Sequence, residues 1–266
     1  MVYGRAGVGK STLLSSFPET MMLSTERISR GLTCFDFNWE AGGVTSWAVF
    51  KKALDLLERD GERGGFRTVA VDTIDAAYNH CLTWVCQQKG ITHPSDLEYG
   101  KGWNLLRTEF RETLLRVPRM GLGLTMTSHC KESTITSPSG SKVSRIEPSC
   151  SGQAYDIIKS ISDVTIYIDW MKNLATGKNI RVMITDGDEV LDAKNNCGLP
   201  RYLGFGKGDG YAQIKAAMKG EDVGIADSKL IPSELAGKAT QDLARSVRSR
   251  PSANSRKKKT TAPRRK

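Results

Sequence analysis

The residues best suited to chemistry lie at the start of the chain. Residues 4–11 match the pattern G-x-x-x-x-G-K-[ST], which surrounds a polyphosphate with backbone amides, an ammonium group and a hydroxyl. The expected nucleotide-binding residues are Gly4, Arg5, Ala6, Gly7, Val8, Gly9, Lys10, Ser11 and Thr12. Lys10 supplies charge for the β- and γ-phosphates, and the Ser11 hydroxyl is a hard oxygen ligand suited to Mg²⁺. We therefore predict that this segment binds a nucleoside triphosphate, taken as ATP, together with Mg²⁺.

Three further candidates stand at the ends of short apolar runs. Asp72 ends the run TVAVD, 62 positions after Lys10, where a carboxylate helps to hold the metal. Thr73 follows it, where many P-loop ATPases carry a glutamate, so we expect Glu26, after the run MMLST, to prepare the attacking water. His129 ends the run GLGLTMTS and is placed to contact the γ-phosphate. With Lys10, Glu26 and His129 form the predicted catalytic group.

The elements that must position these residues alternate between strands and helices. Apolar spacing predicts helices over 45–60, 73–89, 103–117 and, more weakly, 210–219. Strands are expected near 21–26, 68–72, 121–129, 161–170 and 180–185, the last two forming a hairpin around Thr176-Gly177. Residues 131–152 have no apolar period and are expected to form a long loop. Such alternation predicts an α/β fold with a mostly parallel central sheet flanked by helices, followed by a C-terminal β-hairpin.

Charge divides the chain. Its formal net charge is +10, and residues 245–266 contain ten Lys or Arg and no acid, so the first 244 residues sum to about zero. We predict a core over 1–190, a partly helical extension over 191–244 and a disordered basic tail over 245–266. The tail suits contacts with nucleic-acid phosphates, although a solvated tail without a partner is the plain alternative.

Other sequence features narrow the class of protein. Six scattered cysteines without a CxxC pair favour reduced thiols in a cytoplasmic protein. No apolar run approaches the length of a membrane span, so we expect no membrane partner. Only Met1, Val2 and Tyr3 precede the phosphate-binding pattern, so either the first strand is very short or the true start lies upstream of Met1, and we favour the second.

The order of these residues resembles a known family. Lys10, Glu26, Asp72, His129 and the polar segment after it follow the order of the RecA-type ATPase core. The segments LSTE (23–26), EYGKGW (98–103), TSH (127–129) and SDV (162–164) look like those of phage-encoded RecA-like nucleotide-binding proteins, over roughly residues 1–190. The resemblance implies that Glu26 is the catalytic glutamate, that His129 replaces a γ-phosphate-sensing glutamine, and that 131–152 contacts DNA. Tyr99 and Trp103 are at helical spacing, which favours core packing over base stacking.

We therefore expect an ATP-binding and ATP-hydrolysing protein whose activity single-stranded DNA stimulates, acting in phage-type recombination or annealing. Loop 131–152 and tail 245–266 would contact the DNA, in a homo-oligomer in the cytoplasm of the host cell. Two alternatives remain open at this point. One is a P-loop kinase of a nucleoside or small metabolite, and the other is a non-catalytic, ATP-bound loader or scaffold for replication.

Overall fold

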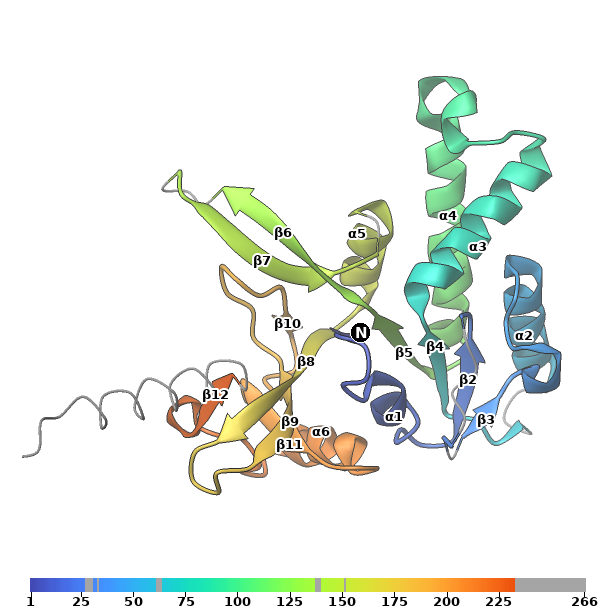
Figure 1. Cartoon of the computed structure of the whole chain (residues 1–266). Coiled ribbons are helices and arrows are strands. Elements are labelled where there is room, and N and C mark those ends of the chain that lie inside the picture. The colour runs from blue at the N-terminus through green and yellow to red at the C-terminus, as the bar shows by residue number, and fades with distance from the viewer. Residues whose placement is uncertain (27–30, 33, 61–63, 137–139, 151, 233–266) are drawn as a thin grey trace, which may run out of the picture.

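A ten-stranded sheet forms the centre of the molecule (Figure 1). The computed structural model describes residues 1–26, 31–32, 34–60, 64–136, 140–150 and 152–232. The main path of the sheet has the order β11-β9-β8-β1-β5-β4-β2-β3, with β10 and β12 also paired to β8. Its strands are β1 (Val2–Gly4), β2 (Thr20–Ser24), β3 (Phe35–Asp36), β4 (Thr68–Asp72), β5 (Gly123–Ser128), β8 (Val164–Asn173), β9 (Asn179–Ile184), β10 (Lys194–Asn195), β11 (Tyr202–Phe205) and β12 (Leu230–Pro232).

The strands from β8 through β1 to β3 are parallel, and the strands beyond β8 are antiparallel. This arrangement confirms the predicted α/β class with a mostly parallel sheet. The antiparallel pair β8–β9 is the predicted hairpin, with Gly177 in its turn at φ 68°. The segment after residue 190 pairs back onto this hairpin through β10, β11 and β12.

Helices cover both faces of the sheet because its strands alternate apolar side chains between two cores. Met21 and Leu23 point to one core with Trp47, whereas Met22 points to the other with Leu13. The first core packs against α2 (Trp47–Asp60), α3 (Ile74–Lys89), α4 (Lys101–Arg119) and α5 (Gly152–Ile161). The second packs against α1 (Lys10–Leu14) and α6 (Gly210–Met218). Short 3-10 turns complete the described elements: η1 (Trp39–Ala41), η3 (Pro94–Asp96), η4 (Glu98–Gly100) and η5 (Asp227–Lys229).

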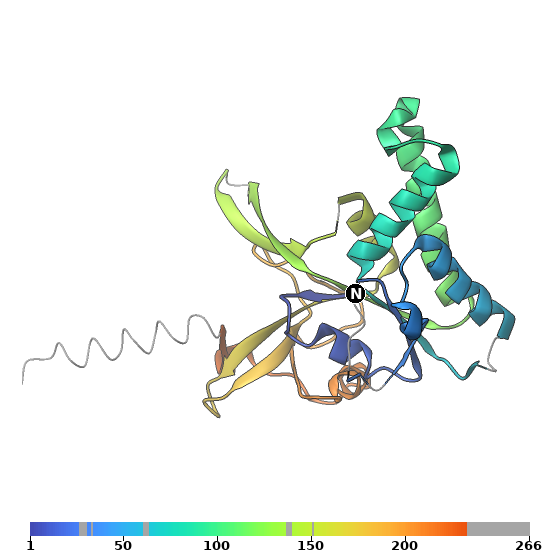
Figure 2. The same ribbon diagram turned by 45° about the vertical axis from the view of Figure 1, so that its right-hand side comes forward.

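The far ends of α3 and α4 extend past the sheet (Figures 1 and 2). The expectation that Tyr99 and Trp103 pack in the core is therefore wrong for Tyr99. That side chain is 90% exposed. Trp103 is half-buried and contacts the His93 ring and the Ser95 hydroxyl, in the connection between the two helices. Trp103 also packs at the margin of the first core, whereas Tyr99 lies in the connection between the helices and joins no core among the described residues.

Residues 131–152 are not the predicted loop. They form most of a two-stranded antiparallel hairpin, β6 (Cys130–Thr136) and β7 (Lys142–Pro148), which runs in register from Lys131↔Glu147 to Thr136↔Lys142. The hairpin projects away from the sheet in both views (Figures 1 and 2). Both of its faces carry exposed or half-exposed side chains, so its strands lack the apolar alternation that would have predicted them.

Two further predictions lie at the edge of the described chain. The basic tail 245–266 falls outside the described residues, and the domain boundary at residue 190 stays a prediction. Within the described ranges, no helix is both long and apolar enough to cross a membrane.

Candidate nucleotide site

The phosphate-binding segment follows β1 and leads directly into α1. Gly4 packs so closely on β8 that a Cβ there would lie 2.6 Å from the carbonyl oxygen of Ile168. Gly9, the N-cap of α1, has φ 99°, a conformation that residues with a Cβ rarely adopt. Two glycines of the pattern are therefore required by the backbone itself. Of the remaining segment, Arg5, Ala6 and Gly7 are exposed and Val8 is buried, while Thr12 is half-buried.

Lys10 is the first residue of α1 and contacts the backbone of this segment. Its side chain is buried, and Nζ donates hydrogen bonds to the carbonyl oxygens of Gly4 and Arg5, at 2.9 and 3.0 Å. Burial lowers the pKa of the Lys10 ammonium, and the charge of Asp72 opposes that shift. Among the described residues, the hydrogen bonds of the Lys10 ammonium go to carbonyl oxygens, and a buried cation gains stabilisation from an anion, so phosphate oxygens suit this position.

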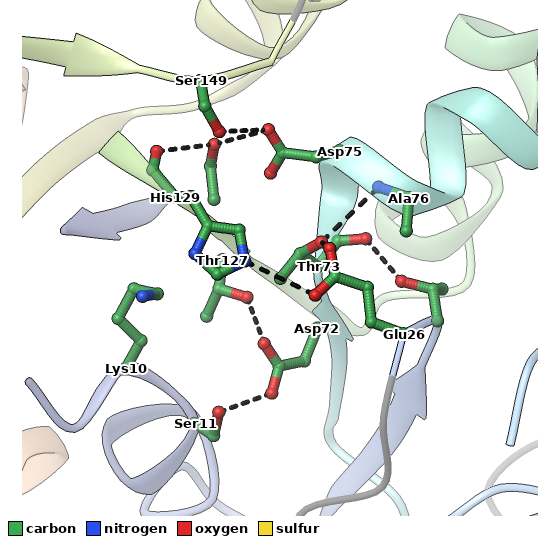
Figure 3. Close-up of polar contacts among 12 residues, drawn as sticks. Lys10, Ser11, Glu26, Asp72, Thr73, Asp75, Ala76, Thr127, His129 and Ser149 are labelled. Carbon is green, nitrogen blue, oxygen red and sulfur yellow. Dashed lines mark hydrogen bonds and ion pairs between the residues drawn. The ribbon is translucent and has the colours of Figure 1, made fainter. Parts of the chain in front are cut away.

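The predicted metal ligands lie together. The Ser11 hydroxyl donates to Asp72 Oδ2 at 2.5 Å, and the Thr127 hydroxyl donates to Asp72 Oδ1 (Figure 3). Within the described residues, no group of three or more His, Cys, Asp or Glu side chains could hold a metal ion. Two hard oxygen donors beside a phosphate-binding loop fit Mg²⁺, because that ion usually takes its other ligands from water and phosphate.

Glu26 follows the end of β2 and His129 follows the end of β5, the strands on either side of β4, and Thr73 lies between β4 and α3. The Thr73 hydroxyl donates to Glu26 Oε1 at 2.8 Å, and His129 Nε2 lies 3.4 Å from Glu26 Oε2 (Figure 3). Both ends of this contact are open to solvent, with side-chain exposures of 43% for Glu26 and 42% for His129. The structure thus brings Glu26, Asp72 and His129 to one sheet edge beside Lys10, while their catalytic roles stay predictions.

Thr73 also explains how the strand end is held. Its hydroxyl oxygen accepts a hydrogen bond from Ala76 N at 3.5 Å and so caps α3. Its carbonyl oxygen accepts from the Thr25 hydroxyl at 2.6 Å, which fixes the ends of β2 and β4 to each other. Sequence reasoning treated position 73 only as a missing glutamate. A threonine directly before a helix is, however, a recognisable N-cap signal.

Asp75 is a second residue whose place the sequence did not reveal. Thr73, not Asp75, caps α3. The Asp75 carboxylate instead accepts hydrogen bonds from the Ser128 hydroxyl at 3.1 Å and the Ser149 hydroxyl at 2.7 Å. These serines lie on either side of the β6–β7 hairpin, so Asp75 ties its base to the sheet.

The hairpin begins directly at the candidate site. His129 is the single residue between β5 and β6, and its carbonyl oxygen accepts from Ser149 N at 2.9 Å. On the hairpin, Lys131 Nζ lies 3.4 Å from Glu147 Oε1 of the opposite strand. A pocket of about 470 Å³ separates the hairpin from the phosphate-binding segment, with Arg5 and Lys131 in its lining.

Comparison with known proteins agrees with this geometry. The model of the AAA domain family AAA_24 matches residues 1–197. The chain belongs to this family. As an AAA_24 member with an intact P-loop, it is an ATP-binding AAA domain.

Two individual proteins are similar to this AAA_24 chain. The SPbeta prophage-derived uncharacterized protein YorG of Bacillus subtilis (strain 168) is 22% identical over 170 residues, which are 63% of this chain and 49% of YorG. The chain thus spans about half the length of that relative. The crystal structure of the KaiC-like protein PH0186 from Pyrococcus horikoshii OT3 has a TM-score of 0.37 and 13% identity, covering 77% of this chain and 83% of the other.

Proposed function

We propose that this protein hydrolyses ATP and binds single-stranded DNA, in phage-type recombination or annealing. The observation that carries the proposal is the position of His129. It contacts Glu26, the candidate general base, and directly precedes the projecting β6–β7 hairpin. A movement of His129 at the phosphate end of the site would therefore act directly on the hairpin, whose polar surface we propose to contact DNA.

The chemistry follows from the side chains at the sheet edge. Lys10 binds the β- and γ-phosphates, and Ser11 and Asp72 hold Mg²⁺, which supplies charge neutralisation when it is bound with the nucleotide. Glu26 lies at the same edge of the sheet, where its carboxylate can accept a proton from the attacking water. Thr73 fixes one carboxylate oxygen of Glu26 and leaves the other toward His129.

Coupling to DNA would run through both strands of the hairpin. The base of β6 contacts Glu26 through His129, and the base of β7 contacts Asp75 through Ser149. If the γ-phosphate draws His129 away from Glu26, the first of these contacts breaks while the second remains. The hairpin would then change its direction in the ATP-bound state, which is the two-state element that a nucleotide switch requires.

The hairpin has the side chains of a backbone-binding surface. Thr134, Thr136, Ser144 and Lys142 are exposed along it, and such groups donate hydrogen bonds to phosphate oxygens. The tail 245–266, with ten basic residues, would add a nucleotide-independent electrostatic contribution. We further propose a homo-oligomer, in which several hairpins contact one DNA strand and a neighbouring subunit completes the site.

The proposal is tested by the anisotropy of a labelled single-stranded oligonucleotide, titrated with the full-length protein with and without ATP and Mg²⁺ across several salt concentrations. ATP is expected to tighten binding. Lys142→Ala should weaken the binding measured with ATP and reduce the slope of log affinity against log salt concentration by about 1, as for the loss of one phosphate contact. Lys178→Ala is the matched control, since Lys178 is also exposed, in the turn of the β8–β9 hairpin. Binding that ignores ATP, or phosphate transfer to an added small molecule without any effect of DNA, would refute the proposal.

A further inference from the structure

The sheet order gives the bound nucleotide a direction. Asp72, Glu26 and His129, which mark the metal and terminal-phosphate end, follow strands β4, β2 and β5, all on one side of β1. Strands β8, β9 and β11 lie on the other side. We therefore infer that a nucleotide whose γ-phosphate lies near Glu26 extends from the phosphate-binding segment toward β8. This step rests on the proposed ATP site and asks what holds the nucleoside.

A row of three side chains stands at that point. In the register of β8 with β1, Ile168 is opposite Gly4, so β8 continues past the beginning of the phosphate-binding segment. Two residues further, Trp170 pairs with Arg181 on β9, and Arg181 pairs with Phe205 on β11. Because side chains directly opposite each other point to the same face, these three share the face that carries α1.

Arg181 reaches from this row to the phosphate-binding segment. A Cβ at Gly9 would lie only 2.3 Å from Arg181 Nη1, so the guanidinium is in contact with that glycine. Its central carbon lies 5.0 Å from the centre of the Phe205 ring and 5.7 Å from that of Trp170. Two aromatic rings thus hold a positive charge beside the N-terminus of α1.

Within the described ranges of the chain, no carboxylate lies at ion-pair distance from Arg181. Arg201 shows the contrast, because it also stacks on an aromatic ring, that of Tyr202, but pairs with Asp188 at 2.9 Å. A cation held against a phosphate-binding loop without a carboxylate partner is suited to an anionic ligand.

Trp170 supplies the remaining element. The Trp170 side chain is 42% exposed, although Ile168, two residues earlier on the same face of β8, is fully buried. An exposed indole ring can stack on any nucleobase, since every base presents a π face. The backing by Arg181 limits the freedom of the ring and so reduces the entropy lost when a base is bound.

We propose that Trp170 and Arg181 form the nucleoside subsite of this protein. The Trp170 ring stacks on the base of a nucleoside triphosphate, and Arg181 supplies positive charge to the phosphate nearest the ribose. Phe205 holds the guanidinium in place. The subsite recognises the aromatic surface of the base, so it binds nucleoside triphosphates more tightly than inorganic triphosphate.

The experiment compares two ligands, ATP and inorganic triphosphate, by calorimetric titration in the presence of Mg²⁺. Trp170→Ala is expected to weaken ATP binding about tenfold or more and to leave triphosphate binding unchanged. Trp170→Phe, which keeps an aromatic ring, should restore most of the affinity for ATP. Arg181→Gln should weaken both ligands. Tyr99→Ala is the matched control, because Tyr99 is an exposed aromatic residue far from the site.

The outcomes separate this inference from the proposed function. If Trp170→Ala and Tyr99→Ala bind ATP as tightly as the unchanged protein, the subsite is refuted and the ATP site stands. If Trp170→Ala weakens both ligands equally, the tryptophan acts on the fold of the loop and the stacking role is also refuted. If the unchanged protein binds neither ligand, both proposals fall. Quenching of tryptophan fluorescence by ATP should be lost in Trp170→Phe, which gives an independent readout.

Discussion

Replacing Glu26 by glutamine separates chemistry from binding. The substitution keeps the size of the side chain, and the amide oxygen can still accept the hydrogen bond from Thr73, which is 2.8 Å long. It removes the negative charge that a base needs in order to accept a proton from water. General-base catalysis contributes about 10²- to 10⁴-fold, or about 3–5 kcal/mol of the barrier at about 1.4 kcal/mol for each factor of ten.

The same change should leave folding and nucleotide binding almost intact. The Glu26 side chain is 43% exposed and its main contact survives, so we expect the free energy of unfolding to change by no more than about 0.5 kcal/mol. Single-turnover hydrolysis of ATP, measured with excess protein, reports the chemical step, and calorimetric titration reports affinity. Glu132→Gln, an exposed acid on β6, is the control. An unchanged single-turnover rate in Glu26→Gln would refute the assignment of Glu26 as the base.

Two predictions concern the structure that supports the site. Burial raises the pKa of Asp192, but hydrogen bonds from Tyr155 and Lys159 outweigh it and hold that pKa below its usual value. The resulting stability is present above the unfolded pKa of about 3.9 and is lost as the pH falls through the folded value. Asp192→Ala should therefore lower the free energy of unfolding at pH 7, measured in urea, by about 2–3 kcal/mol, which is less than for a fully buried pair because Lys159 is 43% exposed. It should also flatten the dependence of stability on pH below pH 4. An unchanged urea midpoint would contradict this prediction. Gly102→Ala places a Cβ 2.1 Å from the carbonyl oxygen of Pro94 and should lower the free energy of unfolding by about 1–3 kcal/mol. A urea midpoint equal to that of the unchanged protein would show instead that α4 can shift to make room.

The elements of the sheet could be predicted because their signals are local. The apolar runs that end in Glu26, Asp72 and His129 are short and continuous, as expected for strands buried on both faces. Parallel strands bring their carboxyl ends to one edge, so the proximity of these residues followed from the fold class. Their order in the sheet could not be read in the same way, because it depends on which helices cover which face.

The hairpin and the nucleoside subsite show what a local signal misses. The β6–β7 hairpin has Thr134, Ile135 and Val143 in its strands but no buried face, so its pattern looked like a loop. Arg181 is 172 positions from Gly9, and nothing near it in the sequence marks a nucleotide contact. The link from Asp75 to Ser149 likewise joins segments that only the tertiary structure brings together. Long-range pairs of polar residues follow no period and therefore require the structure.

The most direct test of this account is ATP hydrolysis by the purified protein, with and without single-stranded DNA, at low and moderate salt. The account predicts that DNA stimulates turnover, that the stimulation falls as salt rises, and that Lys10→Ala abolishes turnover under all conditions. Turnover that DNA does not change, with no salt-sensitive DNA binding, would contradict the link between the nucleotide site and the hairpin.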